Sequence, residues 1–134
     1  MPDFRTRLKT LRDGMLRLHK SLLELVKAAY ERDVEPIKST GQYLNLVLED
    51  PAFQWLRELS AFIVVIDEAL AQKKTPVTEE DAERLIAQAQ VLLVPDEHGT
   101  GFARSYFDLM QQQADAVLAH RDMLQVIAGL KVQS

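Results

Sequence analysis

The sequence contains no cysteine among its 134 residues. That absence excludes disulfide bonds, thiolate metal sites and a cysteine nucleophile. A chain without cysteine is compatible with a reducing compartment. We therefore expect a cytoplasmic protein whose fold rests on the packing of apolar side chains.

Long hydrophobic runs are also missing. The longest uninterrupted apolar run extends only from Ala61 to Ile66, far short of the ~20 residues that a helix needs to cross a bilayer. The first residues, Met1 to Arg7, lead into a charged segment and not into the apolar core of a signal peptide. We expect a protein that neither spans a membrane nor leaves the cell by a recognisable route.

Glycine and proline are sparse, with five of each, and the chain has no repeat, low-complexity tract or interdomain linker. A chain of 134 residues fits one domain, because domains cluster near ~100–150 residues. The apolar fraction of 47% and the charged fraction of 27% are ordinary for a globular protein. We predict a single domain that covers residues 1–134.

The net charge of −4 is unevenly distributed along the chain. Residues 1–20 hold six basic and two acidic side chains, a net +4, so the remaining 114 residues carry −8. An acidic body argues against a nucleic-acid-binding protein, because contact with phosphates needs a broad basic face. A DNA-binding arm at residues 4–20 is the minor alternative, and it predicts an affinity that falls steeply with salt.

A regular apolar pattern predicts a long helix from Asp3 to Asp33. Its apolar residues alternate in steps of four and three over four heptads, which is typical of a packed helical seam. They are Phe4, Leu8, Leu11, Met15, Leu18, Leu22, Leu25 and Ala29. Beside this seam, small residues recur every seven positions at Gly14, Ser21 and Ala28, so we expect a neighbouring helix to approach closely there.

Proline, capping residues and apolar spacing predict four further helices. They cover residues 40–49, residues 51–72, a segment that starts after Thr78, and residues 102–129 with a break near 113–115. The middle of the 51–72 segment is apolar all round, which predicts a place at the centre of the fold. Because short links between long amphipathic helices favour antiparallel neighbours, the predicted fold is an all-α, antiparallel up-and-down helical bundle of four long helices plus one short helix.

Motifs that carry chemistry are missing. Carboxylate-bridged di-iron bundles need Glu-x-x-His on two helices, and no histidine here has a glutamate three positions before it. No Gly-x-Ser-x-Gly nucleophile turn occurs. The turn Gly99-Thr100-Gly101 lacks a lysine and follows Asp96 and Glu97, so we interpret it as a solvent loop and not as a phosphate site. We expect no metal and no cofactor, and we favour a protein that is not an enzyme.

Four residues near the apolar stripes are candidate ligand-binding residues: Trp55, Arg57, Asp67 and His120. Asp67 follows an apolar run, so we expect it to be partly buried and to need a hydrogen-bond donor. Together the four would line a pocket between helices that binds a small molecule. The alternative is structural, with hydrogen bonds for Asp67 and His120 and a place for Trp55 as a lid on the core.

The basic start of the first helix is locally unfavourable, because cations there oppose the helix dipole. Arg5, Arg7 and Arg12 make up this segment. An internal partner is the simpler explanation, either the acidic turn at residues 79–83 or the carboxylates of a second subunit. A partner protein or an anionic ligand is the alternative.

Two segments resemble small bacterial helical-bundle proteins that have no assigned activity. They are Asp50 to Ser60 (DPAFQWLRELS) and Pro95 to Phe102 (PDEHGTGF). The likeness covers most of the chain after about Leu18, and the basic start of the first helix lies outside it. The resemblance implies a bacterial, cytoplasmic, helical protein and transfers no site residue.

Apolar columns on the first helix and on the 51–72 segment exceed what one packed seam requires. Surplus apolar surface of this kind usually marks an interface. We therefore expect a non-catalytic protein–protein interaction module that forms a homodimer through apolar helix faces, with an unidentified second protein as the other candidate partner. The alternative function is that of a small-molecule-binding protein or enzyme with the pocket between helices.

Overall fold

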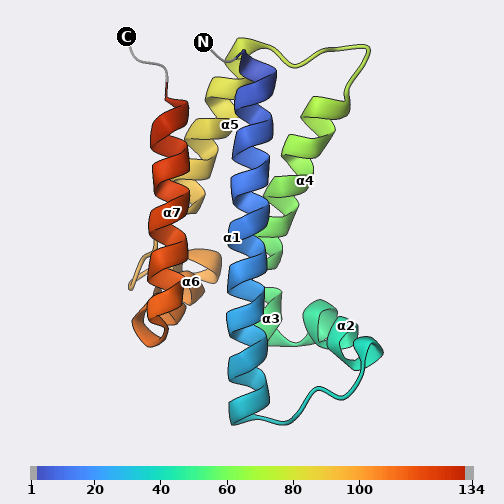
Figure 1. The fold of residues 1–134 in the computed structure, drawn as a ribbon, viewed down its shortest axis with the longest axis vertical. Helices are drawn as coiled ribbons and strands as arrows, with labels where there is room; N and C mark the ends of the chain where they lie inside the picture. The colour runs from blue at the N-terminus through green and yellow to red at the C-terminus, as the bar shows by residue number, and fades with distance from the viewer. Residues whose placement is uncertain (1–2, 132–134) are drawn as a thin grey trace.

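The structure, a computed structural model, describes residues 3–131. Seven helices and no strand occur within that range. They are α1 (Phe4–Asp33), α2 (Thr40–Glu49), α3 (Pro51–Gln54), α4 (Arg57–Ala71), α5 (Glu79–Leu92), α6 (Gly101–Gln112) and α7 (Ala114–Leu130). Together they form an all-α bundle, as predicted (Figure 1). Among the helices of this described range, none is both long enough and apolar enough to cross a bilayer.

The long helices run alternately along the bundle. α1 and α5 run in one direction, and α4 and α7 run in the other (Figure 1). α1 contacts α4, α5 and α7, so it lies among the three. α2 and α3 connect α1 to α4 at one end of the bundle, and α6 lies toward the same end.

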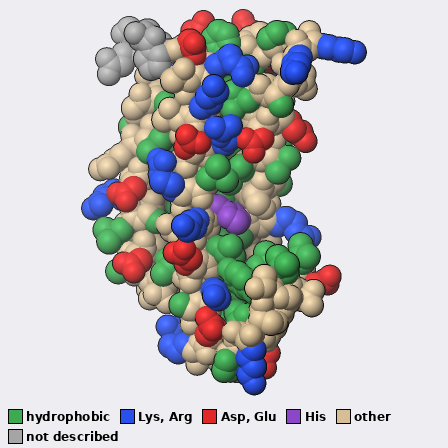
Figure 2. Space-filling model, turned by 45° about the vertical axis from the view of Figure 1, so that its right-hand side comes forward, with side chains coloured by type: hydrophobic (Ala, Val, Ile, Leu, Met, Phe, Trp, Pro, Cys, Tyr) green, Lys and Arg blue, Asp and Glu red, His purple; other side chains and the backbone are tan. Residues whose placement is uncertain are grey.

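The prediction that the 51–72 segment occupies the centre was wrong, because α1 holds that place. α4 buries one side only, through Leu59, Ile63, Ile66 and Leu70. Val64 and Val65 are 50% and 48% exposed, since none of the helices within residues 3–131 covers the outer side of α4. Figure 2 shows hydrophobic side chains gathered on this side of the molecule. The surplus apolar surface predicted for this segment therefore lies on the outside.

The heptad seam of α1 is confirmed from Leu8 to Leu22, while Phe4 at its start is only partly buried. Five of its residues are at most 2% exposed: Leu8, Leu11, Met15, Leu18 and Leu22. In the second half, Val26 and Tyr30 are buried, whereas Leu25 and Ala29 of the predicted seam are only partly buried. A straight α-helix drifts by ~20° per heptad relative to a strict seven-residue repeat, so the buried line moves to the neighbouring column.

The close approach predicted beside this seam occurs at Gly14. A Cβ atom added there would lie 2.9 Å from the Sδ atom of Met123 and 3.3 Å from a methyl carbon of Val126. Both residues belong to α7, the helix that α1 contacts most extensively. The missing side chain therefore allows α7 to pack directly on the α1 backbone.

The predicted 51–72 helix is interrupted at Trp55 and Leu56. Both residues keep right-handed helical backbone angles, so the interruption is a tight turn and not a loop. The turn places Phe53 against two tyrosines, with ring centroids 5.7 Å from Tyr30 and 6.0 Å from Tyr43. α3 thus packs on the end of α1, while α4 follows the length of α1.

The break predicted near 113–115 is confirmed at Gln113. This residue has extended backbone angles and separates α6 from α7. Its N–H still donates to Leu109 O at 2.8 Å, which ends α6 with a satisfied carbonyl. The two interruptions explain why seven helices stand where five were predicted.

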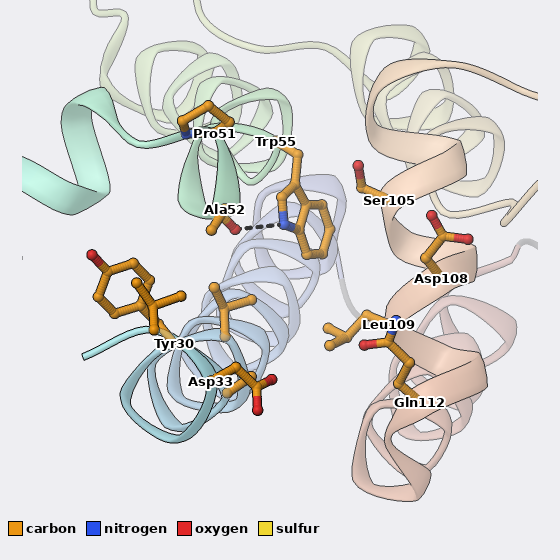
Figure 3. Close-up of a pocket in the computed structure, with 12 residues that line it drawn as sticks. Tyr30, Asp33, Pro51, Ala52, Trp55, Ser105, Asp108, Leu109 and Gln112 are labelled. Atoms are coloured by element: carbon orange, nitrogen blue, oxygen red, sulfur yellow. Dashed lines mark hydrogen bonds between the residues drawn. The ribbon is translucent and has the colours of Figure 1, made fainter. Parts of the chain in front are cut away.

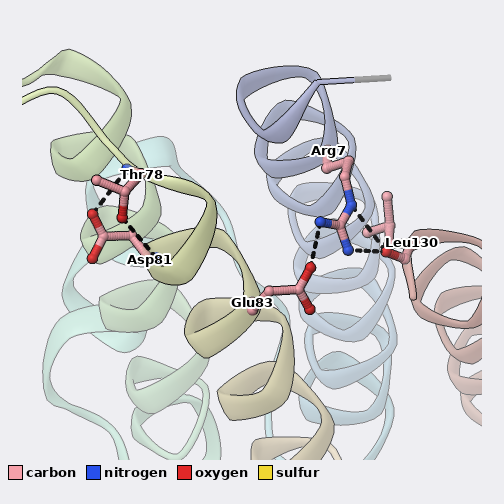
Figure 4. Close-up of polar contacts among 5 residues, drawn as sticks. All are labelled: Arg7, Thr78, Asp81, Glu83 and Leu130. Atoms are coloured by element: carbon pink, nitrogen blue, oxygen red, sulfur yellow. Dashed lines mark hydrogen bonds and ion pairs between the residues drawn. The ribbon is translucent and has the colours of Figure 1, made fainter. Parts of the chain in front are cut away.

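The basic start of α1 has its partners inside the bundle (Figure 4). Arg7, only 7% exposed, donates from Nη1 to Glu83 Oε1 of α5 at 2.5 Å and from Nε to Leu130 O of α7 at 3.0 Å. Arg5 donates from Nη2 to Leu70 O of α4 at 3.0 Å. The carbonyl ends of α4 and α7 carry partial negative charge. The antiparallel packing places those ends beside the cations. An internal partner is therefore confirmed for Arg7 in the predicted acidic turn, at Glu83, whereas the helix-end carbonyls were not predicted.

The start of α6 is capped by another helix. Thr100 makes no side-chain cap, and the N–H of Phe102 donates instead to Glu58 Oε1 of α4 at 3.4 Å. Gly101 has a φ of +58°, a backbone conformation that favours glycine, and a Cβ there would lie 2.9 Å from that oxygen. The turn Gly99-Thr100-Gly101, which we interpreted as a solvent loop, is therefore followed by a helix start that binds the Glu58 carboxylate of the same protein.

Candidate functional site

A pocket of about 370 Å³ lies where the end of α1, α3 and α6 meet (Figure 3). Its apolar lining consists of Val26, Ala29, Tyr30, Val34, Pro51, Ala52, Trp55 and Leu109. Its polar lining consists of Asp33, Ser105, Asp108 and Gln112. A volume of this size falls within the ~300–1,000 Å³ of small-molecule pockets. The pocket is therefore the candidate site for a small-molecule ligand.

Trp55 forms one wall of this pocket because of the turn between α3 and α4. Asp50 caps α3 by accepting from the N–H of Ala52 at 2.8 Å, and Pro51 takes the first helical position. The indole Nε1 then donates to Ala52 O at 3.0 Å. The ring is half-buried, and its centroid lies 5.5 Å from that of Phe102. Two contacts therefore fix the orientation of the indole in the pocket.

A row of aromatic rings leads from Trp55 into the bundle. After Phe102 comes Tyr106, with ring centroids 5.1 Å apart, and then His120, 5.2 Å from Tyr106. Such tilted and edge-to-face pairs stabilise beyond the area that they bury. The structure thus connects two of the sequence-predicted candidates, Trp55 and His120, through residues of α6.

Tyr106 and His120 form a hydrogen bond of 2.7 Å between the tyrosine hydroxyl and Nδ1. Tyr106 is fully buried, and burial raises the pKa of its hydroxyl. Burial likewise lowers the pKa of the half-buried His120. Both groups are therefore neutral near pH 7, as suits a hydrogen bond that holds α6 to α7.

Acidification is expected to lower stability partly through His120. The folded state keeps this histidine neutral because burial lowers its pKa, whereas the unfolded chain binds a proton near the ordinary value of 6.5. Below that pH the unfolded state binds more protons, so stability present at neutral pH is lost as the pH falls. Urea unfolding of His120→Gln at a series of pH values should give a flatter profile than the wild type.

His19 also contributes to the pH dependence of stability, because burial lowers its pKa too. The slope in His120→Gln should therefore shrink and not vanish. His98→Gln, on the exposed loop before α6, is the matched control. An unchanged profile in His120→Gln would contradict the assignment of a neutral, buried His120.

Arg57, the second predicted candidate, does not line the pocket. Its Nη2 donates to Leu48 O at 2.7 Å, and Gln54 Nε2 donates to the same oxygen at 3.3 Å. A cation suits this place, because the carbonyl end of a helix carries partial negative charge. Arg57 therefore holds the end of α2.

Asp67, the third candidate, is exposed, and the prediction of partial burial was wrong. Its Oδ1 lies 3.4 Å from Arg12 Nη1, and its side chain is 49% exposed. The antiparallel alignment of α4 with α1 explains this, because Asp67 falls beside the basic start of α1 and outside the apolar stripe. Of the four candidates, only Trp55 lines the pocket, His120 is connected to it by the aromatic row, and Arg57 and Asp67 lie elsewhere.

Sequence reasoning missed the polar lining of the pocket. Ser105, Asp108 and Gln112 recur at steps of three and four and so share one side of α6. That spacing was the available signal for a polar helix face. Asp33 offered a second signal in the sequence, since an acidic residue at the end of a helix opposes the helix dipole. In the structure, a hydrogen bond from Arg32 lowers the pKa of the Asp33 carboxyl group.

The arrangement suits ligand binding more than metal binding. Within residues 3–131, histidine and carboxylate side chains do not gather in the groups of three or more that hold a metal ion. The pocket offers instead an aromatic wall, an apolar floor and two carboxylates. The likeness to small bacterial helical proteins stays an expectation from the sequence. No family model, no curated protein and no solved structure matches this chain.

Proposed function

We propose that this chain is a non-catalytic interaction module that forms a homodimer through one face of α2. One observation carries the proposal: α2 has no buried residue, although five of its ten residues are apolar. Tyr43, Leu46 and Val47 pack partly against the core. Leu44 and Leu48 remain 56% and 58% exposed. We call this pair, which lies one helical turn apart, the α2 apolar face.

The α2 apolar face is presented in a defined orientation. α2 stands to one side of the bundle (Figure 1), and hydrogen bonds from Arg57 and Gln54 hold the carbonyl of Leu48. Near its start, the Lys27 ammonium lies 5.1 Å from the centre of the Tyr43 ring. A helix fixed in this way loses little conformational freedom when a partner binds, which favours association.

The distribution of charge permits a second copy of the chain as the partner. A two-fold interface brings the same surface of two subunits together, so like charges within it repel. Two copies that each carry −4 repel at long range, yet α2 has a single charged residue, Glu49, at its last position. A neutral and apolar helix is therefore a surface on which two copies of this acidic chain can meet.

The interface must extend beyond α2. A ten-residue helix is about 15 Å long, too short to bury the ~800 Å² per partner of a standard interface. Leu16 of α1 and Val64 of α4 add apolar surface, at 46% and 50% exposed. Figure 2 shows hydrophobic side chains from the middle of this face down toward the end where α2 lies. We propose that this wider surface completes the contact.

Sedimentation velocity tests the proposal directly. The wild type should sediment as a dimer of 15.2 kDa chains, with dissociation on dilution. Leu44→Glu and Leu48→Glu should each shift the equilibrium to the monomer, because a charge would then be buried without a partner. Gln111→Glu is the matched control: it adds the same charge at an exposed position of α6, outside α2, and should leave the dimer intact.

Two results would overturn the proposal. One is a wild type that sediments as a monomer from micromolar to near-millimolar concentration. The other is a dimer that persists in the Leu44→Glu/Leu48→Glu double variant while circular dichroism shows an unchanged helix content. The second result would leave self-association in place but assign it to another surface.

A further inference from the structure

We infer that the pocket between α1, α3 and α6 binds a small organic ammonium ion that carries an apolar group. This inference is independent of the proposed dimer, because the pocket and the α2 apolar face share no residue. It rests on three observations: a tryptophan wall, an apolar floor, and two carboxylates as the charged groups of the lining.

The Trp55 indole provides the surface for the cation. Because its N–H is already donated to Ala52 O at 3.0 Å, the ring presents no free donor and contacts the pocket with apolar atoms. The face of an indole attracts ammonium groups more strongly than any other side-chain ring. Packing against Phe102, with centroids 5.5 Å apart, keeps the ring in place, so the site exists before a ligand arrives.

The charged side chains that line the pocket are both acidic. Among residues 3–131, the ionisable side chains that line the pocket are Asp33, Asp108 and the Tyr30 hydroxyl, and no lysine, arginine or histidine of this range lines it. Figure 3 shows the two carboxylates on different sides of the pocket, Asp33 from α1 and Asp108 from α6. An ammonium group therefore has a carboxylate within the site on either side.

Two helix ends add to this negative potential. Asp33 is the last residue of α1, and Gln112, which also lines the pocket, is the last residue of α6. The carbonyl end of a helix carries partial negative charge. Ser105 and Gln112 contribute side-chain oxygens that accept hydrogen bonds from an N–H group. A primary ammonium, with three donors, is therefore better matched than a neutral ligand.

The two carboxylates already have arginine neighbours. Arg32 Nε lies 3.0 Å from Asp33, and Arg104 Nε lies 3.1 Å from Asp108. All four of these side chains are between 45% and 61% exposed, and exposed pairs of this kind contribute little. Neither arginine lines the pocket. A ligand can therefore share the carboxylates with these arginines, since each carboxylate accepts several hydrogen bonds.

The chain allows a direct binding test, because Trp55 is its only tryptophan. Phenethylamine is the probe, and we expect a saturable change in tryptophan fluorescence together with heat in calorimetric titration. Phenethyl alcohol, which has the same apolar body without the charge, should bind at least about tenfold more weakly, and phenylacetate should not bind. These two analogues separate recognition of the ammonium group from general affinity for an aromatic ring.

Isosteric variants test the carboxylates. Asp33→Asn and Asp108→Asn should each weaken phenethylamine binding by roughly two- to fivefold, and the double variant should weaken it by about the product of the two factors. Asp115→Asn, in the first turn of α7 and outside the pocket, is the matched control and should bind as the wild type does. Circular dichroism checks that each variant keeps its helix content.

Three outcomes would overturn the inference. They are the absence of a saturable signal by both fluorescence and calorimetry, equal affinity for the alcohol and the amine, and full affinity in the Asp33→Asn/Asp108→Asn double variant. None of these outcomes bears on the mass of the protein in sedimentation, so a failure here is distinguishable from a failure of the proposed dimer.

Discussion

Replacement of Tyr106 by alanine is expected to destabilise the fold by about 4 kcal/mol, in the range found for removal of buried aromatic side chains. Tyr106 is fully buried. Its ring contacts Phe102 and His120, and its hydroxyl bonds His120 Nδ1 at 2.7 Å. The alanine variant loses the packing and leaves a cavity between α6 and α7. Equilibrium urea unfolding followed by far-ultraviolet circular dichroism measures the loss.

Tyr106→Phe separates the hydroxyl from the ring. It keeps the aromatic packing and removes only one hydrogen bond to a half-buried partner, so a loss of about 1 kcal/mol is expected. If the alanine and phenylalanine variants were equally stable, the aromatic row would not be a structural element of the bundle. If both unfolded like the wild type, the packing of α6 on α7 described above would be wrong.

Replacement of Arg7 by alanine is expected to cost about 2 kcal/mol, in the range for hydrogen bonds from a charged group, because its partner Glu83 is 45% exposed and is not left as a buried charge. Arg7 is 7% exposed, and its guanidinium bonds both Glu83 of α5 and the carbonyl of Leu130 at the end of α7. Its removal leaves that carbonyl without its donor and empties the space of a long side chain. The midpoint of urea unfolding should fall without a change in slope.

Two control variants assign this loss to its cause. Arg7→Met retains most of the side-chain volume without the charge, so the difference between methionine and alanine reports the packing contribution. Arg84→Ala removes an exposed arginine that pairs with Asp81 at 3.4 Å, and it should change stability by less than about 0.5 kcal/mol. An Arg7→Ala variant as stable as Arg84→Ala would contradict the role of Arg7 in joining three helices.

Helix starts could be predicted from the sequence because a cap depends on neighbouring residues only. Ser39, Asp50 and Thr78 each accept a backbone N–H at the start of α2, α3 and α5, and Thr78 forms a full capping box with Asp81. The bond that satisfies a helix start lies within three residues of the cap. The start of α6 was different, because its cap, Glu58, comes from another helix and leaves no local signal.

The candidate site was only partly predictable. Trp55 was selected from the sequence and lines the pocket, whereas Asp33 and Asp108 were not selected. Asp67 was expected to be partly buried and is exposed. The surroundings of these three aspartates depend on which helix packs beside each of them. That packing is determined by residues far apart in the chain.

Periodicity along the chain determined the helices, the buried line on α1 and the all-α class, because the spacing of apolar residues sets which side of each helix must leave water. Only the tertiary structure decided that α1 lies among the other helices, that Arg7 meets the carbonyl end of α7, and that Asp33 and Asp108 flank Trp55. The physical reason is that an apolar stripe specifies burial but not its partner. Helix lengths, the small residue at Gly14 and the turn at Trp55 together select one packing among several that would bury the same stripes.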